Sequence, residues 1–194
     1  MRANQMERTR SAILAAARDL ADSGAEITMS AVAAEARVSE ATAYRYFPDL
    51  VSLLRAAVMV EDQVAALRSM TAGDDPVERI GQAAEVLGRA VLRRQGAVRA
   101  VVAASIAKPS TARERPAQRF ALIEHALVPW IDANGLAGRA DVEQLVRDLA
   151  LVVSAESVFA LTDLCGLAPD DAIASLVATA RRVTAAGVAA VSGP

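Results

Sequence analysis

The polar side chains between Ser39 and Phe47 are the residues of this sequence best suited to contact another molecule. The segment carries two aliphatic hydroxyls, one carboxylate, two phenols and one guanidinium. Such groups bind phosphate oxygens, and a guanidinium or a carboxylate also reads base edges in the major groove. The segment therefore predicts a nucleic-acid contact surface, made by Ser39, Glu40, Thr42, Tyr44, Arg45 and Tyr46.

Two short helices must position these side chains. Thr28 and Ser39 predict helices over Met29–Ala36 and Ser39–Phe47, because their hydroxyls can accept a backbone N–H at a helix start. A longer helix is predicted over Gln5–Ser23, ending at Gly24. Two capped helices joined by a three-residue turn form a helix-turn-helix unit. The small apolar residues that would let the pair cross closely are Val32, Ala33, Ala36, Val38, Ala43 and Phe47.

The segment 10–54 resembles the DNA-binding domain of the tetracycline-repressor (TetR) family. The resemblance is carried by VSEATAYRYF at 38–47, the following Pro48 and Leu53-Leu54, and by ILAAA at 13–17 with Gly24. It implies a third helix inserted in the major groove, with Thr42 and Tyr44 anchoring phosphates. It also implies that the positions facing DNA are Thr28, Ser30, Glu40, Ala41, Thr42, Tyr44 and Tyr46.

Arginines complete the predicted contact surface. Arg45 is the best candidate for a two-point contact to guanine, a pairing that supplies about 1–3 kcal/mol of discrimination. Phosphate contacts are also expected from the N-terminal arm, through Arg2, Arg8 and Arg10.

Three positions depart from the family pattern. Leu50 stands where a phosphate-binding lysine is common, and Arg37 stands in the turn where glycine is common. Arg37 must therefore adopt the turn at a conformational cost. Glu40 suits the positive end of its helix and could accept from a cytosine amino group, but it also repels phosphate. We expect modest, strongly salt-dependent DNA affinity.

Charge and composition limit the alternatives. Net charge is −2, and residues 1–55 hold seven arginines and seven acids, so charge gives no support to DNA binding. With one cysteine, Cys165, and no apolar run at the N-terminus, we expect a cytoplasmic protein without disulfides or signal peptide. His125 is the only histidine and no nucleophile motif is present, so no enzyme, metal or cofactor is expected.

The remainder predicts a helical body. The fold class is all-α with about nine helices, and we expect a DNA-binding domain at 1–48 and a ligand-sensing and dimerisation domain at 49–194. The longest helices are predicted at 49–70, 140–164 and 169–191. The last two suggest a homodimer paired as a four-helix bundle, through Leu145, Leu149, Val152, Val153, Ala160, Ile173, Leu176, Val177, Ala180 and Val183.

The resemblance implies a regulator, expected to be a repressor of a palindromic operator that an unknown, apolar small molecule releases. The candidate ligand-binding residues are Met59, Phe120, Ile123, Trp130, Glu156 and Phe159, although each could equally be an ordinary core residue. Trp130 and Glu156 are singled out because an indole N–H and a buried carboxylate need partners. The alternative is a helical ligand-binding or protein-interaction module without specific DNA binding, which Leu50, Glu40 and the neutral head favour.

Overall fold

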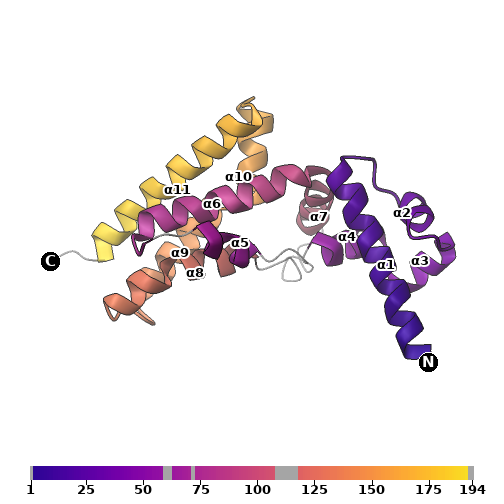
Figure 1. Cartoon of the computed structure of the whole chain (residues 1–194). Coiled ribbons are helices and arrows are strands. Elements are labelled where there is room, and N and C mark those ends of the chain that lie inside the picture. Colours follow the sequence, from indigo (N-terminus) through magenta and orange to yellow (C-terminus); the bar gives the residue numbers. More distant parts are fainter. Residues whose placement is uncertain (1, 59–62, 71–72, 108–117, 192–194) are drawn as a thin grey trace. The chain divides into compact units, whose positions relative to one another are not determined.

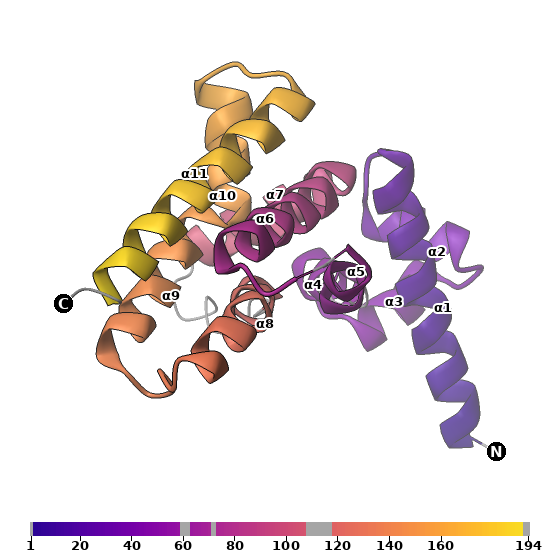
Figure 2. The ribbon, with the colours of Figure 1, turned by 60° about the vertical axis from the view of Figure 1, so that its left-hand side comes forward.

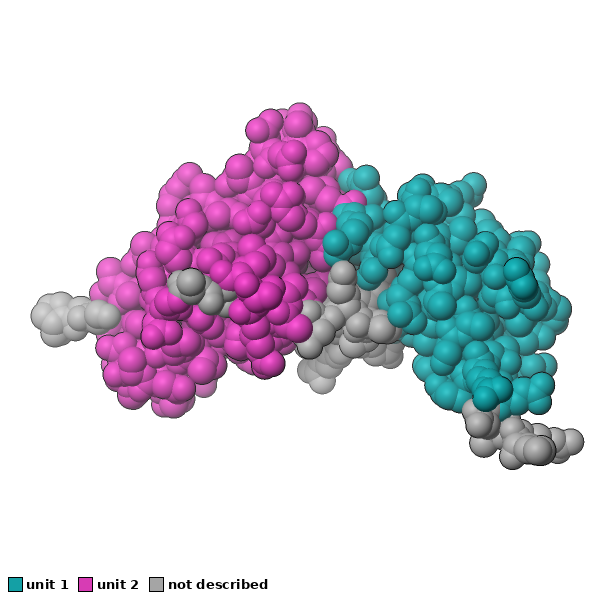
Figure 3. Space-filling view, in the orientation of Figure 1, with its two compact units in different colours: residues 1–61, 93–116 teal, residues 62–92, 117–194 magenta. Residues whose placement is uncertain are grey.

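Every regular element in the structure is a helix. The computed structural model describes residues 2–58, 63–70, 73–107 and 118–191, and it has no strand within them (Figure 1). The predicted all-α class is therefore confirmed. The chain forms two compact units, one from residues 1–61 and 93–116 and one from residues 62–92 and 117–194 (Figure 3). The expected division into a DNA-binding domain at 1–48 and a ligand-sensing and dimerisation domain at 49–194 is a division by function, and it stays a prediction.

The first unit is built around the helix-turn-helix pair. It contains α1 (Arg2–Ser23), α2 (Met29–Glu35), α3 (Glu40–Tyr46), α4 (Leu50–Val58) and α7 (Gln95–Ala107). Helices α1, α2, α3 and α4 enclose a core whose largest fully buried side chains are Ile13, Val32 and Leu53. A second cluster joins α1 and α4 to α7 through Ala21, Leu54, Ala97 and Val101.

The second unit packs long helices closely. It contains α5 (Gln63–Met70), α6 (Pro76–Arg93), α8 (Gln118–Ala133), α9 (Ala140–Val152), α10 (Ala155–Phe159), the π-helical segment η2 (Ala160–Leu164) and α11 (Pro169–Val191) (Figure 2). Glycines permit the close approach of α11, because a Cβ at Gly88 would lie 3.3 Å from Leu176 and one at Gly187 would collide with Leu145.

A buried arginine supports a proline inside α8. Pro129 has no N–H, so the carbonyl of His125, four residues earlier, has no partner within the helix. Arg79 of α6 supplies the missing donor, with Nη2 3.0 Å from the His125 carbonyl and Nε 2.9 Å from the Ala126 carbonyl. Its Nη1 also donates to the Gly73 carbonyl. Because Arg79 donates to the His125 carbonyl, α8 can contain Pro129 without leaving that carbonyl unpaired.

The apolar face expected to join two chains is largely covered within one chain. Helices α9 and α11 lie side by side (Figures 1 and 2). Because of this packing, the expectation is wrong for six residues that a single chain already buries: Leu145, Leu149, Val153, Ile173, Leu176 and Ala180. The other four, Val152, Ala160, Val177 and Val183, are half-buried.

The expected single helix over 140–164 is also wrong. It is interrupted after Val152, where Val153 and Ser154 leave helical geometry before α10 begins. The expected helix over 49–70 corresponds to α4 and α5, with residues 59–62 outside the described part. Helix α11 is long and apolar enough to cross a membrane by length and composition alone, a test that core helices also pass.

Candidate nucleic-acid interface

Helix α2 is held in place by its cap and its core contacts. Thr28 Oγ1 accepts a hydrogen bond from the Ala31 N–H at 3.1 Å, which confirms the predicted cap. On its inner side Met29, Val32 and Ala33 are buried. The opposite side leaves Thr28 and Ser30 exposed. A helix of seven residues is too short to be stable alone, so cap and core together fix its position.

The turn after α2 is a Schellman motif. The Val38 N–H donates to the Ala33 carbonyl at 2.9 Å, and the Arg37 N–H donates to the Ala34 carbonyl at 3.1 Å. Arg37 has φ of 55°, the left-handed conformation that glycine adopts most easily. The structure thus gives Arg37 the backbone conformation for which the cost was predicted. The motif sets the angle at which α3 leaves α2.

Helix α3 begins at its predicted cap. Ser39 Oγ accepts from the Thr42 N–H at 3.2 Å and also lies 2.8 Å from Thr42 Oγ1. The hydroxyls of Ser39 and Thr42 therefore share one hydrogen bond. Ala43 and Phe47 point inward and are buried, so α3 packs on α2 through the residues predicted from sequence.

The outer side of α3 is polar and accessible. Ser39, Glu40, Ala41 and Arg45 are exposed, and Tyr44 keeps 47% of its surface exposed. The structure therefore leaves Tyr44 available to a partner.

Tyr46 and Thr42 are half-buried. Tyr46 packs partly against the core of the first unit, and the Arg45 guanidinium lies 5.5 Å from the centre of its ring. That contact places the guanidinium beside a flat aromatic surface.

Three further positions near the helix-turn-helix pair are singled out from the sequence: Arg8, Arg10 and Leu50. Helix α1 starts at Arg2, ahead of its first buried residue, Ile13, and Arg8 and Arg10 are exposed along it. The Arg10 guanidinium lies 5.5 Å from the Phe47 ring centre, next to the end of α3. Leu50, at the position where the family commonly has lysine, is half-buried against the core of the first unit and offers no charge.

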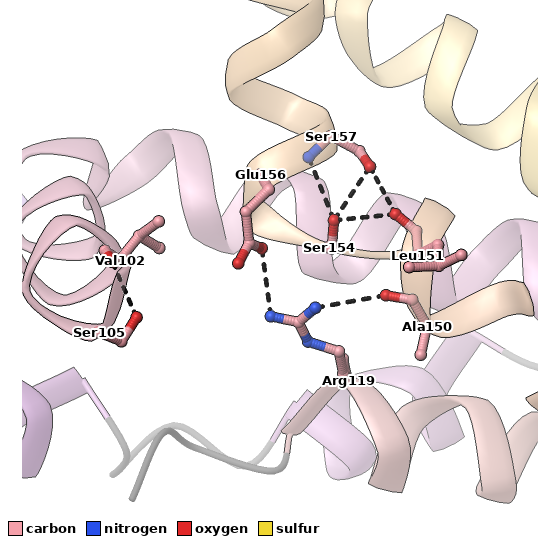
Figure 4. A network of polar contacts seen from close by, with 8 residues as sticks. All are labelled: Val102, Ser105, Arg119, Ala150, Leu151, Ser154, Glu156 and Ser157. Carbon is pink, nitrogen blue, oxygen red and sulfur yellow. Dashed lines mark hydrogen bonds and ion pairs between the residues drawn. The ribbon is translucent and has the colours of Figure 1, made fainter. Parts of the chain in front are cut away.

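The candidate ligand residues have different surroundings. Ile123, Trp130 and Phe159 are buried, Phe120 is 42% exposed, and Met59 lies outside the described residues. Glu156 has the partner that its position required, since Arg119 Nη2 donates to Glu156 Oε2 at 3.2 Å (Figure 4). Sequence reasoning missed Arg119, because no local pattern connects α8 with α10.

The Arg119–Glu156 pair lies at the interruption between α9 and α10. The last carbonyls of α9 lose their helical donors there, and side chains replace them (Figure 4). Arg119 Nη1 donates to the Ala150 carbonyl at 3.3 Å, and Ser157 Oγ donates to the Leu151 carbonyl at 2.7 Å. Ser154 caps α10 by accepting from the Ser157 N–H at 3.1 Å. A half-buried ion pair thus lies next to a helix end where side chains supply the donors to the Ala150 and Leu151 carbonyls.

Part of the first unit is similar to a known protein family. Residues 13–57 match the family model described as bacterial regulatory proteins, tetR family. The matched stretch begins in α1, includes the whole of α2 and α3, and ends in α4. No curated protein matches the chain.

Proposed function

We propose that this chain, a DNA-binding transcription regulator that belongs to the tetR family by its N-terminal domain, is a homodimeric repressor released from a palindromic operator by a small apolar ligand. The observation that carries the proposal is the outer side of α3. Its polar side chains are exposed while Ala43 and Phe47 anchor the helix in a buried core. A recognition helix needs this combination, because base contacts discriminate only when the helix is held in one orientation.

DNA contacts divide by chemistry. Tyr44 and Thr42 bind phosphates, with Thr28 and Ser30 supporting them from α2, and Arg45 reads a base edge. The remaining candidates on α3 line the groove: Ser39, Glu40, Ala41 and Tyr46. With Glu40 exposed beside the phosphates and no lysine at residue 50, the affinity is modest and falls steeply with salt.

Dimerisation uses the outward sides of α9, η2 and α11. Leu151 and Leu164 are 76% and 86% exposed, and α11 leaves Val177, Val183 and Val188 half-buried. Contact between two copies would cover this surface and pair two recognition helices about 34 Å apart along one side of the duplex. Sedimentation analysis is expected to show a dimer that Leu164→Arg converts to a monomer, and an unchanged dimer in that variant contradicts this interface.

The ligand binds in the second unit among apolar side chains of α8 and α10. Ile123, Trp130 and Phe159 provide apolar surface, and Phe120 extends it. The Arg119–Glu156 ion pair connects the same two helices. Release follows only if the ligand binds the DNA-incompetent conformation more tightly than the competent one. No catalytic step is assigned to the chain, and its site of action is the cytoplasm.

Fluorescence anisotropy on DNA from upstream of its own gene tests the function. Wild-type protein is expected to bind tightly at low salt and more weakly as salt rises. Tyr44→Ala is expected to lose most of that affinity, whereas Arg68→Gln, an exposed change on α5, is the matched control and binds like wild type. A folded protein that selects no sequence from a random DNA pool would instead support a helical module without specific DNA binding.

A further inference from the structure

Arg37 stands at a backbone position that disfavours arginine. Its φ of 55° is the only positive φ of a non-glycine residue in the described parts of the chain. Elsewhere in those parts the positive-φ positions are occupied by Gly24, Gly73, Gly135, Gly138 and Gly166. A side chain with a Cβ raises the energy of this conformation, so glycine is the less strained choice.

The turn itself does not require an arginine side chain. Both hydrogen bonds that close the Schellman motif are made by backbone atoms, and a glycine at residue 37 would keep them. The Arg37 side chain is exposed, and it has no ion pair or side-chain hydrogen bond within the described residues. Glu35 and Glu40, which are also exposed, flank it in sequence without pairing with it. Within the described part of the chain, no side-chain ion pair or hydrogen bond of Arg37 therefore compensates for the strain.

The location of Arg37 gives the side chain a partner in the complex. It lies three residues before Glu40, the first residue of α3. The N-terminus of a recognition helix enters the major groove, whose walls are phosphate chains. When α3 enters the groove, the Arg37 guanidinium just before its N-terminus would therefore lie at the edge of the groove, near phosphates. Strain that persists at an exposed position is often explained by function.

Two other features of the helix-turn-helix region increase the benefit of a positive charge at residue 37 for phosphate binding. Glu40 brings a negative charge to the start of α3, and Leu50 leaves the start of α4 without the common lysine. The nearby Arg10 and Arg45 already lie against aromatic rings, of Phe47 and Tyr46. Arg37 is free of such contacts and can turn its whole guanidinium toward a phosphate.

We propose that Arg37 binds a DNA phosphate at the edge of the groove, and that its left-handed turn is retained to place it there. This assignment rests on the proposed DNA binding and adds one phosphate contact that neither the family match nor the sequence resemblance supplies. In this role Arg37 positions the recognition helix and does not read a base.

The substitution Arg37→Gly separates this role from a structural one, because glycine relieves the turn while removing the charge. Binding to a short random-sequence DNA duplex is measured over a series of salt concentrations for wild type, Arg37→Gly, Arg37→Lys and the control Arg68→Gln. Loss of one phosphate contact lowers the slope of log K against log salt by about 0.9 and the affinity by on the order of eightfold at 0.1 M salt. Arg37→Lys and the control are expected to keep the wild-type slope.

Thermal unfolding is followed in the same samples, and the midpoint of Arg37→Gly is expected to equal or exceed that of wild type. An unchanged slope in Arg37→Gly, with wild type bound, overturns the phosphate contact and leaves the DNA-binding function intact. A lowered midpoint overturns it as well, because the arginine would then be holding the turn. A wild-type protein that binds no duplex at low salt overturns both proposals.

Discussion

Arg94 and Asp22 form a two-point ion pair that joins the end of α1 to the start of α7. Arg94 Nε lies 2.5 Å from Asp22 Oδ1, and Nη2 lies 3.0 Å from Oδ2. The arginine side chain is 11% exposed and the aspartate side chain 39% exposed. Asp22 also suits its location poorly without this partner, because the C-terminal end of a helix carries partial negative charge. The pair therefore fixes the last turn of α1 to the chain segment that enters α7.

Replacement of Asp22 by Asn is expected to destabilise the first unit. The substitution leaves the nearly buried Arg94 without its counter-charge, at a cost of about 1–2 kcal/mol after allowance for water around the exposed side of the pair. Urea unfolding followed by circular dichroism measures the change. Asp19→Asn, an exposed change one helical turn earlier in α1, is the control and should unfold like wild type.

The same pair predicts an acid dependence of stability. The hydrogen bond from Arg94 is the main reason that the pKa of Asp22 lies below its usual value, and the charges of Arg94, Arg93 and Arg18 add to the effect against desolvation. A lowered folded-state pKa contributes stability that is fully present above the unfolded-state pKa and is lost as pH falls through the folded-state pKa. Unfolding curves below pH 4 should therefore converge for wild type and Asp22→Asn, and a constant difference between them down to the lowest pH would refute the assignment.

Arg79 and Pro129 are expected to be energetically coupled. Arg79→Met leaves the His125 carbonyl buried without a donor, which costs about 1–3 kcal/mol. In the background of Pro129→Ala the restored N–H can bond to that carbonyl, so the same change should cost less. A double-mutant cycle of unfolding free energies measures the coupling. Equal effects of Arg79→Met in both backgrounds would show that Arg79 does not compensate for the proline.

Two glycines in helices should respond to alanine in opposite ways. At Gly187 a Cβ would collide with the side chain of Leu145, which is 3% exposed, so the core around it must repack. Gly187→Ala should therefore destabilise the second unit by about 1–3 kcal/mol. At Gly96 the new Cβ would meet no described atom within 4 Å beyond its chain neighbours and its own helix backbone, so alanine should stabilise α7 by up to roughly 1 kcal/mol. Thermal melts of the two variants test the contrast, which would fail if both shifted in the same direction.

Glu40→Gln should raise DNA affinity. The substitution removes a carboxylate near the expected phosphate path but keeps the size of the side chain, and Glu40 is exposed, so folding should be unaffected. Non-specific affinity at low salt is expected to increase several-fold, by the electrostatic argument that governs phosphate binding. If Glu40 instead accepts a hydrogen bond from a cytosine amino group, the variant loses discrimination at one base pair by about 1–3 kcal/mol. Anisotropy on random and operator duplexes separates the two results.

The helix-turn-helix pair was predictable because its determinants are local. Thr28 and Ser39 cap helices within three residues of themselves, and Ala43 and Phe47 recur on the face that meets α2. The location of the turn residue Arg37 followed from the same spacing. Helix starts, turns and apolar faces of this kind can be identified from a short segment.

The second unit was harder to predict because its determinants are distant in sequence. Arg119 completes the end of α9 from α8, and no local pattern connects these two helices. Ser154, which caps α10, is a local signal of the interruption that the expected single helix did not use. The apolar face of the helices expected at 140–164 and 169–191 was predicted. Hydrophobic periodicity does not indicate whether the same chain or a second copy covers that face. Leu149 and Leu176 are buried within one chain, not between two.

The support that Arg79 gives to α8 has a consequence for how the second unit folds. Helix α8 cannot supply a donor to the His125 carbonyl, because Pro129 has no N–H. That donor comes from Arg79, 46 positions earlier in the chain. Neither helix therefore reaches its final form before the other has docked. The second unit should gain structure in one cooperative step, in which amide protons on both sides of Pro129 become protected from exchange together with those of α6.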